Sequence, residues 1–276
     1  MPIPRFAVFG HPIAHSLSPR LHALFGEQTG IALEYVAVDA TPEAFADTVR
    51  GFFAAGGRGA NVTLPHKAAA FALGRVRTPV AERLGVANVL TALDDGRLEA
   101  DSNDGAGMLA DMRARCEIDP VHRNALLLGA GGAACAAACA LLDAGVKSLV
   151  IANRTLQRAQ ALAGTLAQHA RVRVREWNAL DRSRPFDLIV NATSAGVRHA
   201  ALDLPSSLAG ARTVAYDLSY GPGAQPFVGW ARAKGCAAAF DGLGMLVETA
   251  AASFEGWHGV RPDTDAALRA LRQVSQ

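Results

Sequence analysis

The 276-residue sequence predicts an α/β protein with two α/β domains around a cleft. Strand-like and helix-like segments alternate along the chain, and two such alternations meet near residue 104. Short apolar runs without polar alternation predict strands that are buried on both faces of a parallel sheet. A chain of this length can form two compact domains. We expect one domain at residues 1–104 plus 243–276 and the other at 105–242, with the active site in the cleft.

The first alternation has two clear boundary signals. Pro19 suits the first position of a helix, and Asp94-Asp95-Gly96 suits the turn of a hairpin. In order we expect a strand at Arg5–Phe9, a helix at Pro19–Thr29, a strand at Leu33–Val38, a helix at Pro42–Ala55, a strand at Gly59–Val62, short helices after Lys67 and Val80, strands at Ala87–Leu93 and Arg97–Ala100, and a helix at Gly105–Cys116.

The second alternation contains more strongly apolar strands. We expect strands at Ala125–Leu128, Ser148–Ala152, Val172–Arg175, Phe186–Asn191, Thr213–Asp217 and Ala237–Phe240. Helices are expected at Ala133–Ala144, Leu243–Trp257 and Thr264–Val274, and in most of the remaining gaps.

Composition excludes several classes of partner. The net charge of +2 gives no electrostatic reason to expect nucleic acid or a membrane surface. The first ten residues are typical of a strand rather than a signal peptide, and the four cysteines lack the spacing of metal ligands, so we expect no metal. Cys135 and Cys139 share a helix face and are expected to be small core residues. These features favour a reducing cytoplasm.

A glycine turn follows the apolar run Ala125–Leu128 and precedes an alanine-rich helix. Such a turn lets backbone amides approach a pyrophosphate at the helix N-terminus, so it predicts a Rossmann-like dinucleotide-binding domain. Ala134 replaces the third glycine of the pattern, which is an accepted variant. The predicted contacts of the turn are Gly129, Ala130, Gly131, Gly132 and Ala133.

The end of the next strand predicts which dinucleotide binds. An acid at this position suits the ribose hydroxyl of NAD, whereas an arginine suits the 2′-phosphate of NADP. This chain has Arg154 there and Arg158 one helical turn later. The pattern favours NADP and hydride transfer; the alternative is an ordinary turn with a surface arginine.

Hydride transfer to or from an alcohol also needs a group that exchanges a proton with the substrate oxygen. Lys67 is a candidate because it follows a strand, with Asn61 and Thr63 as orienting groups. Asp104 would keep that lysine cationic if the two paired. The alternatives are an exposed loop lysine and an Asp/Asn turn. Ser16 and Ser18 could bind a carboxylate, although Ser18 before Pro19 also suits an ordinary helix N-cap.

Together, these strings resemble the shikimate dehydrogenase family over nearly the whole chain. The motifs that carry the resemblance occur in the family's order, and the whole set is far more specific than any one of the motifs. They are Phe9-Gly10-His11-Pro12-Ile13-Ala14-His15-Ser16, Gly59-Ala60-Asn61-Val62-Thr63, Gly129-Ala130-Gly131-Gly132, Asn153-Arg154-Thr155, Asn191-Ala192-Thr193-Ser194 and Asp241-Gly242-Leu243-Gly244-Met245-Leu246.

The resemblance implies reversible, NADP-dependent reduction of 3-dehydroshikimate to shikimate, on the route through chorismate to aromatic amino acids. By this resemblance Lys67 and Asp104 are the acid/base pair, and both also bind substrate. The other implied substrate contacts are Ser16, Ser18, Thr63, Asn88 and Tyr220. The implied cofactor contacts besides the glycine turn are Asn153, Arg154, Thr155, Arg158, Thr193, Leu218 and Gly242.

Three departures from the family pattern leave alternatives open. Val89 follows Asn88 where the family has threonine, Ser102-Asn103 replaces Asn-Thr, and Thr249 replaces a substrate-binding glutamine. Loss of a long amide can change which cyclic hydroxy acid binds, so a paralogue that oxidises quinate or another cyclic hydroxy acid is an alternative. A non-catalytic NADP-binding regulatory protein is a further alternative, which the intact Lys67 and Asp104 disfavour. A homodimer is left open.

Overall fold

The computed structural model describes residues 3–196 and 202–274, and these residues form two compact units. Unit 1 comprises Met1–Asp104 and Leu246–Gln276, and unit 2 comprises Gly105–Met245. Each unit contains one six-stranded sheet with helices packed against it. The predicted fold class, an α/β chain with two sheet domains of which the second is Rossmann-like, is confirmed.

The sheet of unit 1 is mixed. Its strands are β1 (Arg5–Gly10), β2 (Glu34–Asp39), β3 (Gly57–Val62), β4 (Val76–Arg77), β5 (Val89–Ala92) and β6 (Leu98–Asp101), and their spatial order is β2-β1-β3-β5-β6-β4. The pairs β1–β2, β1–β3 and β4–β6 are parallel, whereas β5 pairs antiparallel with both β3 and β6. The hairpin expected around Asp94-Asp95-Gly96 is therefore present as β5–β6.

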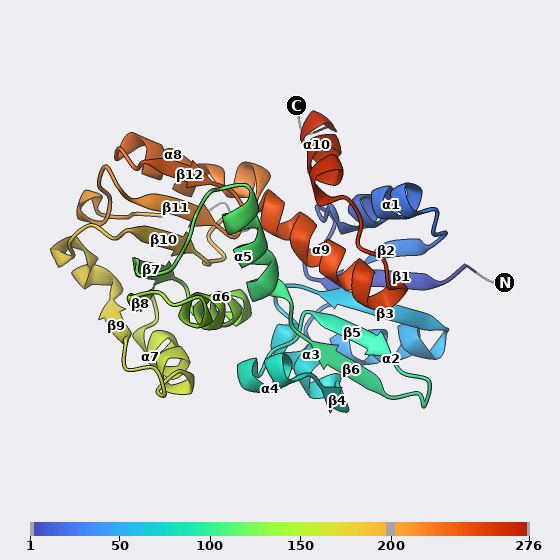
Figure 1. Cartoon of the computed structure of the whole chain (residues 1–276). Helices are drawn as coiled ribbons and strands as arrows, with labels where there is room; N and C mark the ends of the chain where they lie inside the picture. The colour runs from blue at the N-terminus through green and yellow to red at the C-terminus, as the bar shows by residue number, and fades with distance from the viewer. Residues whose placement is uncertain (1–2, 197–201, 275–276) are drawn as a thin grey trace. The chain divides into compact units, whose positions relative to one another are not determined.

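Helices cover both faces of this sheet (Figure 1). They are α1 (Ser18–Thr29), α2 (Phe45–Ala54), α3 (Lys67–Leu73), α4 (Pro79–Leu84), α9 (Leu243–His258) and α10 (Thr264–Val274). Phe45 and Val49 of α2 pack with Phe9 in one core cluster. On the opposite face, the ring of Phe6 stacks on Trp257 of α9 at 4.8 Å. Alternate β1 residues thus face opposite layers, as the two-residue period of a strand requires.

The sheet of unit 2 is entirely parallel. Its strands are β7 (Asn124–Leu128), β8 (Ser148–Asn153), β9 (Val172–Glu176), β10 (Leu188–Asn191), β11 (Val214–Asp217) and β12 (Ala238–Phe240), in the order β12-β11-β10-β7-β8-β9. From the β9 edge this is the 3-2-1-4-5-6 order of a doubly wound dinucleotide-binding sheet. The chain reverses direction across the sheet between β7 and β10, and ligands bind at the carboxyl ends of strands beside such a switch point.

Unit 2 has α5 (Asp104–Ala114), α6 (Gly132–Asp143), α7 (Leu156–Thr165) and α8 (Gln225–Ala233), with short 3₁₀ helices η1 (Trp177–Arg182), η2 (Ser206–Leu208) and η3 (Gly221–Gly223). Phe227 of α8 packs with Leu126 of β7 in one core cluster. The hydroxyl of buried Tyr216 donates to Oδ2 of Asp111 on α5 at 2.7 Å, so a buried polar pair ties α5 to β11.

Three local details differ from the predictions. Helix α1 has Leu17 as its N-cap and begins at Ser18 without a side-chain cap, so the N-cap interpretation of Ser18 was wrong. The short strand β4 was not predicted, because two residues carry no periodic pattern. The segment Trp177–Arg182 forms a 3₁₀ helix where the alternation favoured an α-helix, and the extended Glu176 and Ser183 flank it.

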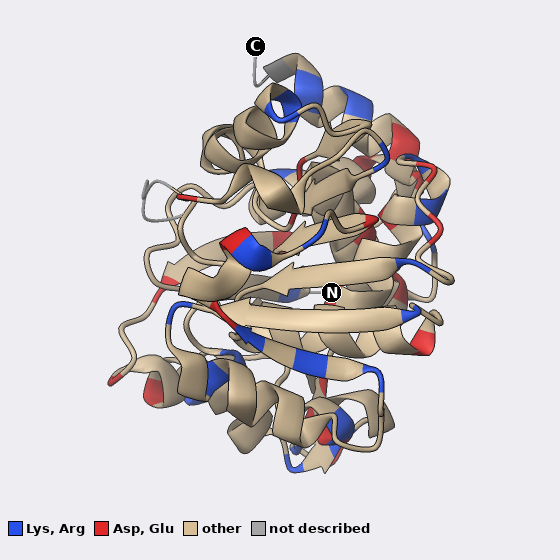
Figure 2. Ribbon diagram, turned by 90° about the vertical axis from the view of Figure 1, so that its left-hand side faces the viewer, with Lys and Arg blue, Asp and Glu red and all other residues tan. Residues whose placement is uncertain are grey.

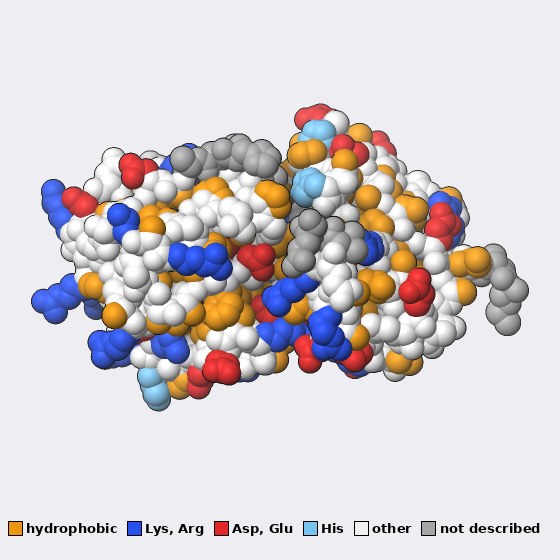
Figure 3. Space-filling view, turned by 90° about the horizontal axis from the view of Figure 1, so that it is seen from above, with side chains coloured by type: hydrophobic (Ala, Val, Ile, Leu, Met, Phe, Trp, Pro, Cys, Tyr) orange, Lys and Arg blue, Asp and Glu red, His pale blue; other side chains and the backbone are white. Residues whose placement is uncertain are grey.

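Charged residues of both signs occur on the sides of the molecule shown in Figures 2 and 3. Basic residues alternate along the edge strand β9 (Figure 2), and charged side chains on an edge strand hinder pairing with another chain. Acidic, basic and apolar side chains are intermingled on the face in Figure 3. Within the described ranges, none of the helices combines the length and hydropathy required to span a bilayer.

Candidate active site and dinucleotide site

Lys67 and Asp104 form an ion pair in unit 1. Lys67 is the first residue of α3, Asp104 begins α5, and the Lys67 ammonium donates to Oδ2 of Asp104. Their side chains are only 11% and 9% exposed. A pair this far removed from water is weakly screened, so the carboxylate holds the lysine ammonium in one position. The structure therefore brings together the two residues predicted as the acid/base pair.

The second oxygen of Asp104 is also held. The carboxamide nitrogen of buried Asn88 donates to Oδ1 of Asp104 at 3.0 Å and to Oδ1 of Asn103 at 2.8 Å. The backbone N–H of Asn103 donates in return to Oδ1 of Asn88 at 2.9 Å. Both the nitrogen and the oxygen of the Asn88 carboxamide therefore form hydrogen bonds within the site. Both carboxylate oxygens of Asp104 accept a hydrogen bond, one from Lys67 and one from Asn88.

Further polar side chains continue from Asn103 into unit 1. Its carboxamide nitrogen donates to Oγ of Ser253 at 3.0 Å and to the carbonyl of Thr249 at 3.1 Å, both on α9. Asn61 also donates to Ser253, at 2.8 Å, and accepts from the hydroxyl of Tyr35 at 2.7 Å. Sequence reasoning proposed Asn61 as an orienting group but missed Ser253 and Tyr35, because a serine in an apolar helix and a tyrosine in a strand gave no distinguishing signal.

The loops that carry Ser16, Ser18 and Thr63 are neighbours. They follow the adjacent strands β1 and β3, and the backbone N–H of His11 donates to the carbonyl of Leu64 at 2.9 Å. A side chain at Gly10 would lie 2.6 Å from Thr63, so glycine allows the two loops to approach. Ser18 is buried, its backbone N–H donates to Oγ of Ser16 at 3.3 Å, and Ser16 and Thr63 are half-buried.

Two buried hydroxyl groups lie next to this network without a hydrogen-bond partner. They belong to Ser102 and Thr249, which are 7% and 9% exposed. Ser102 precedes Asn103 in the chain, and the Thr249 carbonyl accepts from Asn103. A buried hydroxyl that lacks a partner carries an unfavourable desolvation cost, which a polar ligand with a complementary group would offset.

In unit 2, the predicted glycine turn lies between β7 and α6. Gly129 has φ +109°, and a side chain there would meet the carbonyl of Ala192 at 2.7 Å, so only glycine suits this position. Gly131 is the N-cap of α6 and has open space around its Cα, as close approach of a pyrophosphate requires. Ala130, Gly132 and Ala133 complete the turn and the first residues of α6, whose free backbone N–H groups favour an anion.

The predicted phosphate contacts follow the neighbouring strand. β7 and β8 pair in parallel with Leu128 opposite Ala152, so both turns lie at the same edge of the sheet. Asn153 ends β8, and Thr155 is the N-cap of α7. Arg154 and Arg158 are both exposed. Two exposed guanidinium groups beside the glycine turn are suited to a phosphate, which arginine binds through paired hydrogen bonds.

Strands β10 and β11 add a buried polar pair at this edge. Nδ2 of Asn191 donates to Oδ2 of Asp217 at 2.9 Å, and Oδ1 of Asn191 accepts from the hydroxyl of Thr193 at 2.8 Å. Burial raises the pKa of Asp217 to about 6. A side chain at Gly242 would lie 2.5 Å from the carbonyl of Leu218, so these two residues, both predicted cofactor contacts, lie against each other.

Tyr220, predicted to contact substrate, follows β11 in unit 2 and is half-buried. The other predicted substrate contacts all belong to unit 1.

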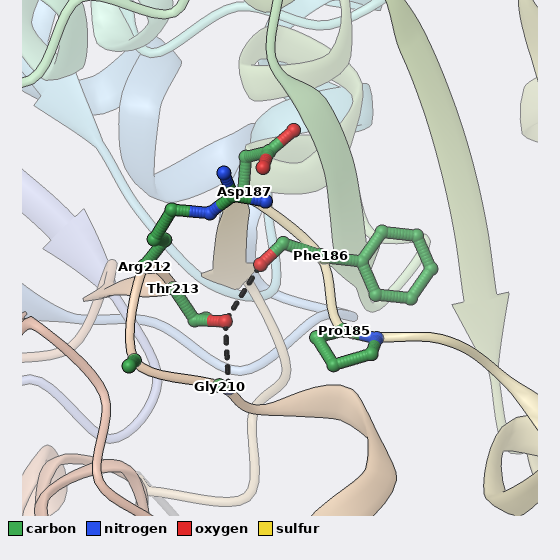
Figure 4. Close-up of a pocket in the computed structure, with 7 residues that line it drawn as sticks. Pro185, Phe186, Asp187, Gly210, Arg212 and Thr213 are labelled. Carbon is green, nitrogen blue, oxygen red and sulfur yellow. Dashed lines mark hydrogen bonds between the residues drawn. The ribbon is translucent and has the colours of Figure 1, made fainter.

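A separate pocket of about 240 Å³ opens at the opposite ends of β10 and β11 (Figure 4). It is lined by residues that precede these strands, including Phe186, Asp187, Arg212 and Thr213. The Thr213 hydroxyl donates to the carbonyl of Phe186 at 2.7 Å and accepts from Gly210 N–H at 2.9 Å. None of the predicted site residues lines this pocket. In the part of the chain that the structure describes, no group of three or more His, Cys, Asp or Glu side chains is arranged to hold a metal.

Unit 2 thus has the architecture of a dinucleotide-binding domain, and unit 1 carries a buried lysine–carboxylate pair, which together define the class of nicotinamide-dependent oxidoreductases. Comparison with known families gives a more specific result. The family model described as shikimate dehydrogenase substrate binding domain matches residues 8–90. Shikimate / quinate 5-dehydrogenase matches residues 112–200, and the shikimate 5′-dehydrogenase C-terminal domain matches residues 242–272.

Similar proteins extend over almost the full length of the chain. A shikimate dehydrogenase (NADP(+)) from Xanthomonas campestris pv. campestris is 51% identical over 274 residues, which cover 99% of this chain and 96% of that one. An Ael1 enzyme from Pseudomonas putida is 42% identical, with a TM-score of 0.87 and coverage of 97% and 98%. Shikimate 5-dehydrogenase from Thermus thermophilus, solved with NADP(H) and shikimate, is 37% identical, with a TM-score of 0.86 and coverage of 98% and 99%. The chain belongs to the shikimate dehydrogenase family, which confirms the resemblance seen in the sequence.

Proposed function

We propose that this protein is an NADP-dependent shikimate dehydrogenase that interconverts shikimate and 3-dehydroshikimate, with Lys67 and Asp104 as its acid/base pair. The observation that carries the proposal is the buried Lys67–Asp104 ion pair at the start of two helices. Xanthomonas and Thermus relatives with this activity in their names support the choice of substrate.

In the reductive direction, the Lys67 ammonium donates a proton to the carbonyl oxygen of 3-dehydroshikimate. In the oxidative direction, the neutral amine accepts the proton of the corresponding shikimate hydroxyl. Oδ2 of Asp104 accepts a hydrogen bond from the Lys67 ammonium, and Oδ1 accepts one from Asn88. The bound cofactor would supply the hydride as NADPH in the reductive direction and receive it as NADP⁺ in the oxidative direction. The chain needs no covalent nucleophile for this chemistry.

Recognition of the substrate is assigned to polar groups of unit 1 and to Tyr220. Shikimate carries a carboxylate and several ring hydroxyls. The adjacent hydroxyls of Ser16 and Ser18 are suited to the carboxylate, and Thr63 and Asn88 to ring hydroxyls. Tyr220, in unit 2, is a further proposed contact. Fixed donors of this kind orient the reacting carbon, and orientation supplies much of the rate in reactions that form no covalent intermediate.

The proposed cofactor NADP fits the residues of unit 2. Gly129, Gly131 and the first turn of α6 would accept the pyrophosphate, because this backbone is open and the helix begins there. Arg154 and Arg158, with Asn153 and Thr155, would bind the 2′-phosphate. Thr193, Leu218 and Gly242 would lie beside the nicotinamide half. No acidic residue takes the place of Arg154, which favours NADP over NAD.

A second candidate substrate is quinate, which has one more ring hydroxyl than shikimate. The unpartnered hydroxyl groups of Ser102 and Thr249 favour this alternative, because an additional substrate hydroxyl would give them a partner. One of the matching family models also has quinate in its description.

We further propose that the enzyme works in the cytoplasm. All four cysteines are free thiols, which suits a reducing compartment.

Steady-state kinetics with shikimate and quinate, each with NADP⁺ and NAD⁺, tests the proposal. We expect the highest kcat/KM for shikimate with NADP⁺. A higher kcat/KM for quinate would reassign the substrate, and tight NADP binding without turnover of either acid would indicate the regulatory alternative.

A further inference from the structure

We infer that Asn103 is a positioning residue for the proton transfer, acting through Asn88 on the carboxylate of Asp104. The inference deepens the proposed function and rests on it. Asn103 lies in the link between β6 and α5, immediately before Asp104, and was not among the predicted site residues. Its side chain reaches Asn88 on one side and α9 on the other.

Asn88 alone does not determine where its amide points, because a carboxamide can rotate about its last bond. Asn103 prevents this rotation with two hydrogen bonds of opposite sense. Its Oδ1 accepts from Nδ2 of Asn88 at 2.8 Å, and its backbone N–H donates to Oδ1 of Asn88 at 2.9 Å. The second N–H of Asn88 therefore points at Oδ1 of Asp104, 3.0 Å away.

Asn103 is in turn fixed by α9. Its two amide hydrogens are used by Oγ of Ser253 and the carbonyl of Thr249, and Ser253 is 2% exposed. Asn61 donates to the same Ser253 oxygen, and the Tyr35 hydroxyl donates to Asn61. The hydrogen-bonded series Tyr35–Asn61–Ser253–Asn103–Asn88 thus connects β2, β3 and α9 to the catalytic carboxylate.

This series has a specific consequence for Lys67. Asp104 has Lys67 on Oδ2 and Asn88 on Oδ1, so a rotation of the carboxylate moves the lysine ammonium as well. Without the Asn103 side chain the backbone N–H still holds Oδ1 of Asn88, but Nδ2 of Asn88 loses one of its two acceptors, so the Lys67–Asp104 pair is held less firmly in one orientation. A loss of orientation lowers the rate of the chemical step more than it lowers the affinity for substrate.

The test compares Asn103→Ala and the similarly shaped Asn103→Leu with the wild type, with thermal melting to establish that each variant is folded. We expect kcat for shikimate oxidation to fall roughly 3- to 10-fold, as for loss of a hydrogen bond between two neutral amides, with KM changed less than about twofold. Asn178→Ala, at an exposed position of η1, is the matched control and should keep the wild-type kcat.

The double variant Lys67→Ala/Asn103→Ala separates positioning from a general structural role. If Asn103 acts through the Lys67–Asp104 pair, the double variant has the same kcat as Lys67→Ala within about twofold, because groups that act as a unit are not additive. Independent, multiplicative losses would overturn the inference. So would a folded Asn103→Leu variant with wild-type kcat, which would leave the proposed function intact. A wild type that does not oxidise shikimate would instead overturn the proposed function.

Discussion

The ammonium of Lys67 and the carboxylate of Asp104 are paired although 37 residues separate them in the chain. Lys67 and Asp104 are each the first residue of a helix, and the side chain of each is about nine-tenths buried. The backbone N–H of Ala87 donates to the carbonyl of Lys67 at 2.9 Å, which fixes the start of α3 beside the strand that follows Asn88. The pair is therefore held by both backbone and side-chain contacts.

Asp104→Asn should lower kcat for shikimate oxidation by roughly 10- to 100-fold, because an amide cannot replace the charged partner of Lys67. KM for shikimate should change much less. Steady-state kinetics checks the split, and Asp47→Asn, on the exposed surface of α2, is the matched control. A wild-type kcat in folded Asp104→Asn would exclude Asp104 from the acid/base pair.

Arg154→Ala should change the choice of cofactor. Loss of its charged hydrogen bonds to the 2′-phosphate should lower kcat/KM for NADP⁺ by roughly 10- to 100-fold and leave that for NAD⁺ within about threefold. Arg173→Ala, at an exposed position of β9, should leave both values unchanged. An equal loss of kcat/KM for NADP⁺ and for NAD⁺ would show that Arg154 does not bind the 2′-phosphate.

Two glycines of α9 should respond in opposite directions to alanine. A side chain at Gly244 would lie 1.8 Å from Oδ1 of Asp111, whose other oxygen accepts from Tyr216, so Gly244→Ala should destabilise the fold by roughly 1–3 kcal/mol. Gly256 has open space, so Gly256→Ala should stabilise it by up to about 1 kcal/mol. Urea unfolding measures both. A Gly244→Ala variant as stable as the wild type would mean that Gly244 does not lie against the Asp111 carboxylate.

Stability at acid pH should depend on His22. Burial lowers the pKa of His22 from 6.5 to about 3, and its ring stacks on Tyr35 at 3.9 Å. Between pH 6.5 and about 3, His22 is therefore protonated in the unfolded chain but neutral in the folded chain. The free energy of unfolding consequently falls as the pH drops through this range. At about pH 4.5 the loss attributable to His22 should be roughly 2–3 kcal/mol.

His22→Phe should remove this component, giving a smaller difference between urea midpoints at pH 7 and about pH 4.5 than in the wild type. Phe25→Leu, in the same helix and aromatic cluster, should lower stability by a similar amount at both pH values. An unchanged pH dependence in His22→Phe would show that His22 is accessible to protons in the folded state.

Periodicity and turn signals were sufficient to predict most of the fold. The dinucleotide site could be predicted from two short sequence segments, the apolar run before Gly129 and the arginine after the next strand. Both segments lie at the ends of neighbouring parallel strands. The mixed order of the first sheet could not be predicted, since short strands such as Val76–Arg77 carry no pattern and their pairing is decided by long-range packing.

Residues of the candidate site could be predicted only where they lie within recognisable sequence motifs. Lys67 and Asp104 met that condition. Ser253 did not, because it lies in an apolar helix far along the chain and becomes relevant only when folding brings it within 3.0 Å of Asn103. Asn103 was noted as a departure from the family pattern, but its contacts with α9 depend on the three-dimensional arrangement alone.

The most direct test of the account is formation of NADPH from NADP⁺ and shikimate by the purified protein, measured beside Lys67→Ala, with Lys234→Ala at the exposed end of α8 as control. We predict saturable turnover by the wild type and the control, and a kcat lower by roughly 10²–10⁴ in Lys67→Ala, the usual share of general acid/base catalysis. Absence of turnover by the wild type at millimolar shikimate, or an undiminished rate in Lys67→Ala, would contradict the account.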